Sequence, residues 1–121
     1  VEGPYKNKFD IKTRALLPLV DGARLFALYF EVRGINNTYQ RFKQFAITDP
    51  KHAEVYLNCA EAFLVLSKFR TLEGLKNDNS GEFINLEELS KIDREKLKNA
   101  LAPMRELEEL IKSKFQLTHF S

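Results

Sequence analysis

Residues 52–75 contain no helix-breaking residue before Gly74 and predict one long helix. Asp49 can cap this helix, and Pro50 suits its first turn because no backbone N–H is needed there. The middle turns are apolar on almost every side apart from Glu61, which is typical of a helix enclosed by other helices. We therefore expect the rest of the chain to cover it.

Two shorter helices are predicted before it, because apolar residues recur there at three- and four-residue steps. The first begins at Pro18 and ends at Gly34. The second covers residues 38–47, with Asn37 as its cap and Gln40 three residues later to reach back. The connection to the long helix is tight, so the second helix and the long helix should be neighbours.

The chain after residue 75 changes to the turn-rich segment KNDNSGE, which predicts a link. Asn85 with Glu88 three residues later predicts a short helical turn. Ser90 with Asp93 predicts the start of the last helix, whose apolar stripe continues to Phe115.

Together these patterns predict an all-α fold, a four-helix bundle whose neighbours are mainly antiparallel. An extended lead-in of residues 1–15 precedes the bundle domain of residues 16–116, and a short extra helical turn precedes the last helix. Residues 117–121 are expected to form a frayed tail. Signals for strands are nearly absent.

Composition narrows the class of protein without selecting a partner. A chain of 121 residues predicts one domain, and its 19 basic and 17 acidic residues are well mixed, which makes no case for nucleic acid. No apolar run reaches the roughly 20 residues that a membrane span needs. The single Cys59 lies among apolar residues and reads as a buried side chain, which suits a reducing, cytoplasmic location.

The chain begins without Met, which suggests a processed chain or part of a longer protein. If a longer protein exists, its chemistry can lie upstream of these residues.

The sequence lacks the known signatures of catalytic and metal-binding sites. His52 and His119 lie far apart and neither has a second histidine nearby, which argues against a zinc site. A calcium loop at residues 76–87 would begin with Lys76, and a cation there repels the ion. The chain has no glycine-rich phosphate loop, no G-x-S-x-G turn, and no Gly-Ser turn followed by paired aspartates to hold Mg²⁺. We therefore expect no enzyme activity, no metal and no cofactor in this chain alone.

Six basic and polar residues remain as candidates for contact with a ligand. Arginine suits phosphate and carboxylate groups because its planar fork donates two parallel hydrogen bonds. The alternative for each residue is a solvated side chain or one paired with a nearby glutamate, as Arg70 can pair with Glu73. The candidate substrate-binding residues are Lys12, Arg24, Thr38, Arg41, Arg70 and Lys98.

Four segments carry a family resemblance: DIKTRALLPLVDGARLFAL, NNTYQRF, AEAFLVLSKFR and INLEELSKIDREKLKNAL. Over roughly residues 9–116 the chain resembles the C-terminal helical, substrate-binding domain of bacterial signal-transduction nucleotidyltransferases. In that family, cyclic-nucleotide-binding-like, CBS and nucleotidyltransferase domains typically precede it. The family's positions map onto Asp10, Lys12, Pro18, Arg24, Asn37, Thr38, Arg41, Arg70, Leu97 and Lys98.

The resemblance implies a domain that packs against a catalytic nucleotidyltransferase domain of the same parent chain and holds an anionic substrate. It also implies Mg and a nucleoside triphosphate for the parent protein, and a nucleotide or an acidic protein as substrate. One departure stands out. Many members have a second arginine and a His-Gln pair where this chain has Leu72, Glu73 and Gly74, so its ligand differs or the site is lost.

Two functions follow as hypotheses. The first is substrate binding by Lys12, Arg24, Arg41 and Arg70 gathered at one end or face of the bundle. The second is a helical interaction or dimerisation module without a ligand pocket, in which the basic residues are solvated. Convergence of the basic side chains in space favours binding, and scattered side chains favour docking.

Overall fold

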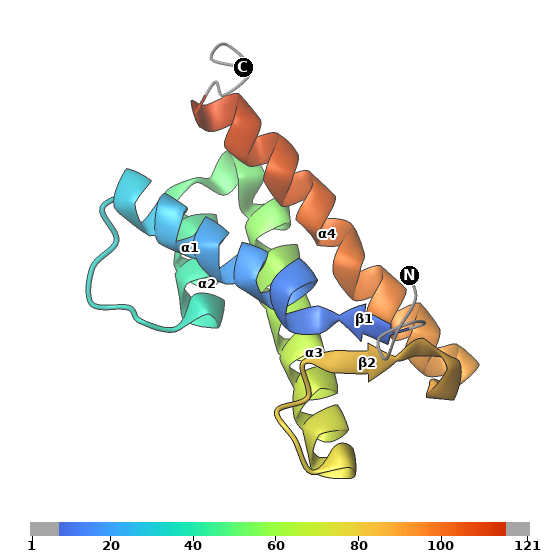
Figure 1. Cartoon of the computed structure of the whole chain (residues 1–121). Helices are drawn as coiled ribbons and strands as arrows, with labels where there is room; N and C mark the ends of the chain where they lie inside the picture. Colours follow the sequence, from blue (N-terminus) through green and yellow to red (C-terminus); the bar gives the residue numbers. More distant parts are fainter. Residues whose placement is uncertain (1–7, 116–121) are drawn as a thin grey trace.

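The computed structural model describes residues 8–115, and α3, Ala53–Asn77, lies at their centre (Figure 1). Tyr56, Cys59 and Leu66 of this helix are fully buried. A 3₁₀ turn, η2, Pro50–His52, leads into it. The helix continues past Gly74 and ends where Asp78 adopts a left-handed conformation, φ 54°. The predicted long helix is therefore present, and it is slightly longer than the apolar pattern indicated.

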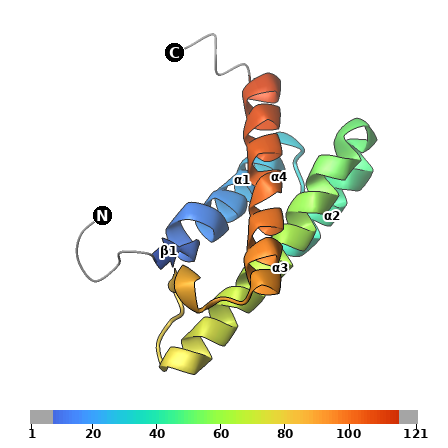
Figure 2. The same cartoon turned by 90° about the vertical axis from the view of Figure 1, so that its right-hand side faces the viewer.

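α4, Lys91–Phe115, packs along α3, and Figure 2 shows it in front, between α1 on one side and α3 with α2 on the other. The Ser90 hydroxyl accepts a hydrogen bond from the backbone N–H of Asp93 at 3.1 Å, so the predicted cap is confirmed. The helix runs on across Pro103. Its buried residues recur at three- and four-residue steps: Leu97, Ala100, Pro103, Leu107 and Leu110.

α1, Leu17–Tyr29, and α2, Thr38–Thr48, complete the all-α bundle. The Asn37 side chain accepts from the backbone N–H of Gln40 at 2.9 Å, which is the predicted cap of α2. An aromatic cluster joins the helices, because the Phe26 ring lies 5.6 to 5.9 Å from four other rings. Edge and tilted contacts of this kind add to the stability that burial gives. The partner rings are Phe30, Phe45, Tyr56 and Phe115.

The predicted extended lead-in is wrong for its second half, because residues 12–16 form a π-helical segment, η1, Lys12–Leu16, continuous with α1. The Asp10 carboxylate accepts from the backbone N–H of Thr13 at 3.0 Å and so begins the helix seven residues before Pro18. The buried Ile11 and Ala15 are one turn apart, a helical spacing that the polar residues between them obscured. Residues 1–7 and the predicted frayed tail, 117–121, lie outside the described residues.

The first helix also ends earlier than predicted, at Tyr29 rather than Gly34. Glu31 adopts a left-handed conformation, φ 56°, and the N–H of Val32 donates to the carbonyl of Ala27 at 2.9 Å. This is the Schellman arrangement that satisfies the last carbonyls of a helix, and it usually has glycine at the left-handed position. Because the chain reverses at Glu31, it cannot continue as a helix to Gly34.

The sequence pattern missed a two-stranded antiparallel sheet formed by β1, Lys8–Asp10, and β2, Phe83–Asn85. Phe9 lies opposite the fully buried Ile84. Strands of three residues are too short to display the alternation that predicts a strand. After β2, the predicted helical turn is present as η3, Leu86–Glu88, with the Asn85 side chain accepting from the N–H of Glu87 at 3.1 Å.

Asp49 does not cap η2 or α3 through its side chain, contrary to prediction. Its Oδ2 accepts instead from the Tyr56 hydroxyl at 2.7 Å, the Lys114 Nζ at 3.0 Å and the His52 Nδ1 at 3.1 Å. These side chains come from η2, α3 and α4, so the carboxylate joins three elements. Burial raises the pKa of Asp49, but the hydrogen bonds from Tyr56, Lys114 and His52 lower it by more, and the net pKa lies below its ordinary value.

None of the helices within residues 8–115 combines the length and the apolar character needed to cross a membrane.

Candidate functional site

Two of the predicted residues, Arg24 of α1 and Arg41 of α2, line one small pocket of about 340 Å³ beside the α1–α2 connection. A third arginine, Arg33, lines the same pocket from the connection itself. We call this the arginine pocket. Its other lining residues are Ala27, Leu28, Glu31 and Val32.

The local fold explains why the three arginines meet. The left-handed Glu31 reverses the chain at the end of α1, and the left-handed Gly34, φ 79°, turns it again toward α2. Arg33 lies between these two turns. The connection is therefore folded back beside α1, and Glu31 contributes the one carboxylate to the lining of the pocket.

Arg41 is held in place by its own helix and by the connection. It is half-buried, one turn into α2, and its Nε donates to the carbonyl of Ile35 at 2.7 Å. The remaining N–H groups of its guanidinium have no partner within residues 8–115, which leaves donors for a ligand. Thr38, another predicted residue, is buried at the first position of the same helix, next to the Asn37 cap.

Arg24 is exposed on α1 and has no ion pair with any other part of the described chain. The arginine pocket thus combines one anchored arginine with two exposed ones.

Lys12 and Arg70 meet at a different place, around Glu82 in the segment between α3 and β2. The Lys12 Nζ lies 3.5 Å from Glu82 Oε1, and the Arg70 Nε donates to the carbonyl of Ser80 at 3.0 Å. The Ser80 hydroxyl donates to Glu82 Oε2 at 2.9 Å. This hydrogen bond, with the nearby charges of Lys12 and Arg70, holds the pKa of Glu82 below its ordinary value.

The expected pairing of Arg70 with Glu73 is absent from residues 8–115. Glu73 is buried and accepts instead from the Asn77 side chain at 3.0 Å. Gly74 also has a structural role, because a Cβ at this position would lie 2.6 Å from the carbonyl oxygen of Asn79. Two of the three residues that depart from the family pattern therefore support the link after α3.

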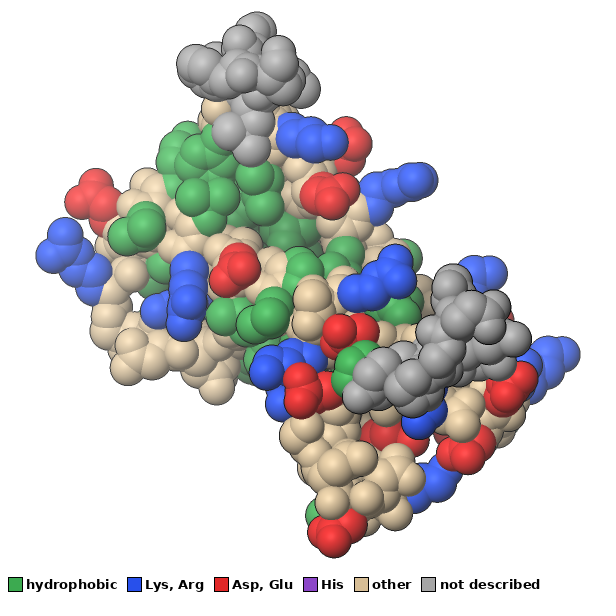
Figure 3. Space-filling view, in the orientation of Figure 1, with side chains coloured by type: hydrophobic (Ala, Val, Ile, Leu, Met, Phe, Trp, Pro, Cys, Tyr) green, Lys and Arg blue, Asp and Glu red, His purple; other side chains and the backbone are tan. Residues whose placement is uncertain are grey.

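Lys98 belongs neither to the arginine pocket nor to the residues around Glu82. It is exposed on α4 and lines a shallow groove of about 440 Å³ with Phe9 of β1 and Leu86 of η3. Figure 3 shows basic and acidic side chains interspersed on one face of the molecule. The six predicted residues thus divide among the α1–α2 connection, the surroundings of Glu82 and the groove on α4.

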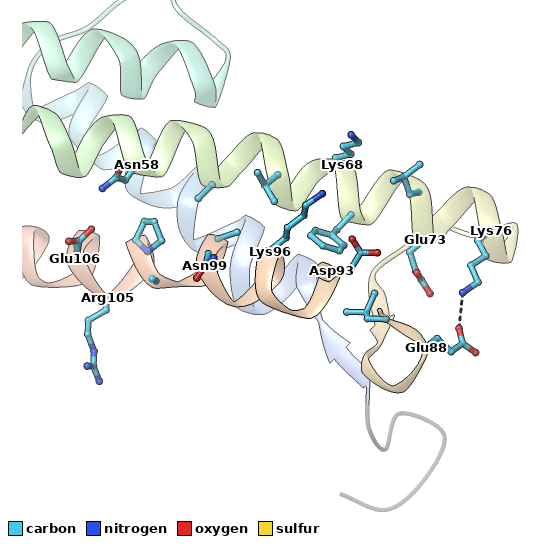
Figure 4. Close-up of a pocket in the computed structure, with 18 residues that line it drawn as sticks. Asn58, Lys68, Glu73, Lys76, Glu88, Asp93, Lys96, Asn99, Arg105 and Glu106 are labelled. Carbon is cyan, nitrogen blue, oxygen red and sulfur yellow. Dashed lines mark hydrogen bonds and ion pairs between the residues drawn. The ribbon is translucent and has the colours of Figure 1, made fainter. Parts of the chain in front are cut away.

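A groove of about 1020 Å³, which the sequence did not predict, lies between α3 and α4 (Figure 4). Its floor is apolar and includes Val65 and Phe69 of α3 and Pro103 of α4. Charged side chains line its edges, and at one end Lys76 Nζ lies 2.9 Å from Glu88 Oε1. The apolar character of α3 on nearly every side is the signal for this groove in the sequence. That pattern predicted instead that other helices enclose α3 completely.

Neither of the buried side chains Cys59 and Tyr56 suggests catalysis. Burial, and to a smaller extent Glu106, raises the pKa of the Cys59 thiol to about 12, so the thiol is protonated and unreactive. Burial and the hydrogen bond to Asp49 raise the pKa of Tyr56 far above its ordinary value. Within residues 8–115, no group of three or more His, Cys, Asp or Glu side chains could hold a metal ion.

Residues 1–115 match the model of a family described as "Putative nucleotidyltransferase substrate binding domain". No curated protein and no solved structure matches the chain.

Proposed function

Because the chain belongs to this family of nucleotidyltransferase substrate-binding domains, we propose that its arginine pocket holds an anionic group of the substrate. The group is a phosphate of the nucleotide or a phosphate or carboxylate of the acceptor. In this proposal the domain packs on a catalytic nucleotidyltransferase domain of the same parent chain. That domain carries the Mg²⁺ and the nucleoside triphosphate.

The observation that carries the proposal is the meeting of Arg24 and Arg41 from two different helices in one pocket. Arginines that converge can each offer two parallel N–H groups to the same oxyanion. Arg41 is already oriented by its bond to Ile35, so less rotamer freedom is lost when it binds. Arg33 adds a third cation that the sequence pattern did not single out.

The other predicted residues take supporting parts in this proposal. Thr38 is buried at the first position of α2, beside the Asn37 cap that fixes the start of the helix carrying Arg41. Lys12 and Arg70 already have an anionic neighbour, Glu82, so they would contact substrate only if that carboxylate moved. Lys98 offers a cation beside the α4 groove, where a second part of a substrate could lie.

Titration calorimetry with inorganic triphosphate and with ATP tests the proposal on the 121-residue chain. We expect Arg24→Ala to weaken binding about ten- to a hundredfold, the loss typical of a charge-assisted hydrogen bond. Lys51→Ala is the matched control, because Lys51 is an exposed cation outside the pockets described here and its removal changes the net charge equally. Equal affinities for the two variants would remove the arginine pocket from substrate binding.

The second function, a helical interaction or dimerisation module, is favoured by a separate observation. Four leucines on one side of α3 remain exposed, although a central helix should be covered. These leucines line no part of the arginine pocket, so the chain can have both roles.

A further inference from the structure

One face of α3 lacks the cover that its sequence predicts. Leu57, Leu64, Leu72 and Leu75 are 40, 45, 54 and 76% exposed. At 100° per residue, Leu57, Leu64 and Leu75 fall within about 20° of one line along the helix, and Leu72 lies about 60° away. We call these four residues the leucine stripe. A run of exposed leucines this regular indicates a surface for another protein.

Two opposite charges complete the same face. Glu61 and Lys68 are both exposed and lie between the leucines in helical angle. Neither has an ion pair with any part of the chain that the structure describes. Lys68 and Leu72 also line the groove between α3 and α4, so this face of α3 borders that groove.

The order of these residues is self-complementary in an antiparallel arrangement. Leu57 and Leu72 are equally far in sequence from a point between Leu64 and Val65, and so are Glu61 and Lys68. If two copies of α3 cross at this point on a two-fold axis, Leu57 faces Leu72 of the second copy. By the same symmetry Glu61 faces Lys68 of the second copy, twice per dimer.

We propose that the leucine stripe is a homodimer interface in which two α3 helices pack antiparallel about Leu64. The occupant is a second copy of this chain, because its own stripe offers both the leucines and the complementary charges. The proposal does not depend on ligand binding by the arginine pocket. The two faces share no residue, so a dimer leaves both arginine pockets open.

Sedimentation equilibrium of the 121-residue chain tests the interface. We expect a dimer, and we expect Glu61→Lys alone or Lys68→Glu alone to weaken it about tenfold, because each places like charges together at two sites. The double variant Glu61→Lys with Lys68→Glu should restore the original dimer. Seven residues separate these positions, about 10 Å along one helix, so the rescue can only act between chains.

Ile47→Lys is the control for added surface charge, because Ile47 is 73% exposed on α2, outside the stripe and outside the arginine pocket. It should leave the dimer unchanged, whereas Leu64→Lys should abolish it. Circular dichroism confirms that each variant remains folded. A wild-type chain that stays monomeric at millimolar concentration would overturn the proposal and assign the stripe to another domain.

Cysteine cross-linking tests the antiparallel direction. Native Cys59 is buried, so it does not compete for the oxidant. Mixing a Leu57→Cys chain with a Leu72→Cys chain should give disulfide-linked heterodimers, and neither variant alone should cross-link efficiently. Cross-linking of the Leu57→Cys chain with itself would indicate a parallel arrangement and would contradict the proposal.

Discussion

Asp49 joins three elements through one carboxylate oxygen, and this makes its charge important for stability. Its side chain is largely buried, and its three donors come from His52, Tyr56 and Lys114. Lys114 also lies over the rings of Tyr29 and Phe30, at 5.9 and 5.7 Å from their centroids. Asp49, which the sequence predicts as a helix cap, therefore makes a tertiary contact at the end of the bundle where α3 begins and α4 ends (Figure 1).

We expect Asp49→Asn to lower the free energy of unfolding by about 2 kcal/mol at neutral pH, because charge-assisted hydrogen bonds are lost. The folded-state pKa lies below the ordinary 3.8, so the charged form is the stabilised one. The contribution is complete above that ordinary value and disappears as the pH falls through the folded-state pKa.

Urea unfolding at several pH values measures the contribution of the Asp49 charge to the free energy of unfolding. The stability difference between wild type and Asp49→Asn should shrink below about pH 4. Asp21→Asn is the control, because Asp21 is exposed on α1 and has no hydrogen bond or ion pair within residues 8–115. A difference between Asp49→Asn and wild type that stays constant down to low pH would show that the charge of Asp49 contributes nothing.

At this same scale the sequence predicted residue types better than their partners. Arginine chemistry suggested Arg24 and Arg41 as residues that could share a ligand, and both line one pocket in the structure. Arg33 was missed because it lies in a connection with no helical spacing to relate it to the others. Lys12 and Arg70 could not be separated from them, because only tertiary packing brings Glu82 between those two cations.

At the scale of elements, the connection after α3 depends on close contact between backbones. Gly74 lies under the carbonyl of Asn79, and Gly81 packs against Gly74 and Arg70. Side chains at these glycines would push the segment off α3. The connection in turn delivers β2 to its partner β1, so the glycines position the small sheet as well.

We expect Gly74→Ala to destabilise the fold by about 2 kcal/mol, the usual cost of overpacking, although alanine favours helix. Thr71→Ala is the matched control, because Thr71 is exposed in the same helix and should gain a few tenths of a kcal/mol from propensity alone. Thermal unfolding of both variants gives the comparison. A Gly74→Ala chain as stable as Thr71→Ala would show that the connection can shift away at no cost.

The helices were predictable because each has a periodic apolar face and a recognisable start, as at Asn37 and Ser90. The helix start at Asp10 was not predictable, because polar residues fill the first turn and Pro18 gave a stronger signal for a helix start further along the chain. The sheet was not predictable either, because strands of three residues are too short to show an alternation of apolar and polar residues. Its existence depends on a partner more than seventy residues away in the chain.

At the scale of the whole molecule, stability should be highest in the middle of α3 and lowest in the connection after it. Tyr56, Cys59 and Leu66 are fully buried among the other helices, whereas residues 76–80 are exposed. We expect amide hydrogens of residues 56–66 to exchange only when the whole chain unfolds, and those of residues 78–82 to exchange through local opening.

Hydrogen exchange followed by NMR tests this difference. The slow amides should have exchange free energies equal to the global free energy of unfolding, and they should fall with it in Gly74→Ala. The fast amides of residues 78–82 should be insensitive to mild denaturant. Equal protection of both segments would contradict the expected gradient.

The small sheet also gives the molecule a mechanical path. β1 is paired with β2, and the N–H of Ile11 donates to the carbonyl of Glu82 at 2.9 Å, directly beside Arg70 near the end of α3. A displacement of β1 is therefore carried through this hydrogen bond to residues 80–82, where Arg70 of α3 donates to the carbonyl of Ser80 at 3.0 Å. Tension applied at the first strand acts on the C-terminal part of α3.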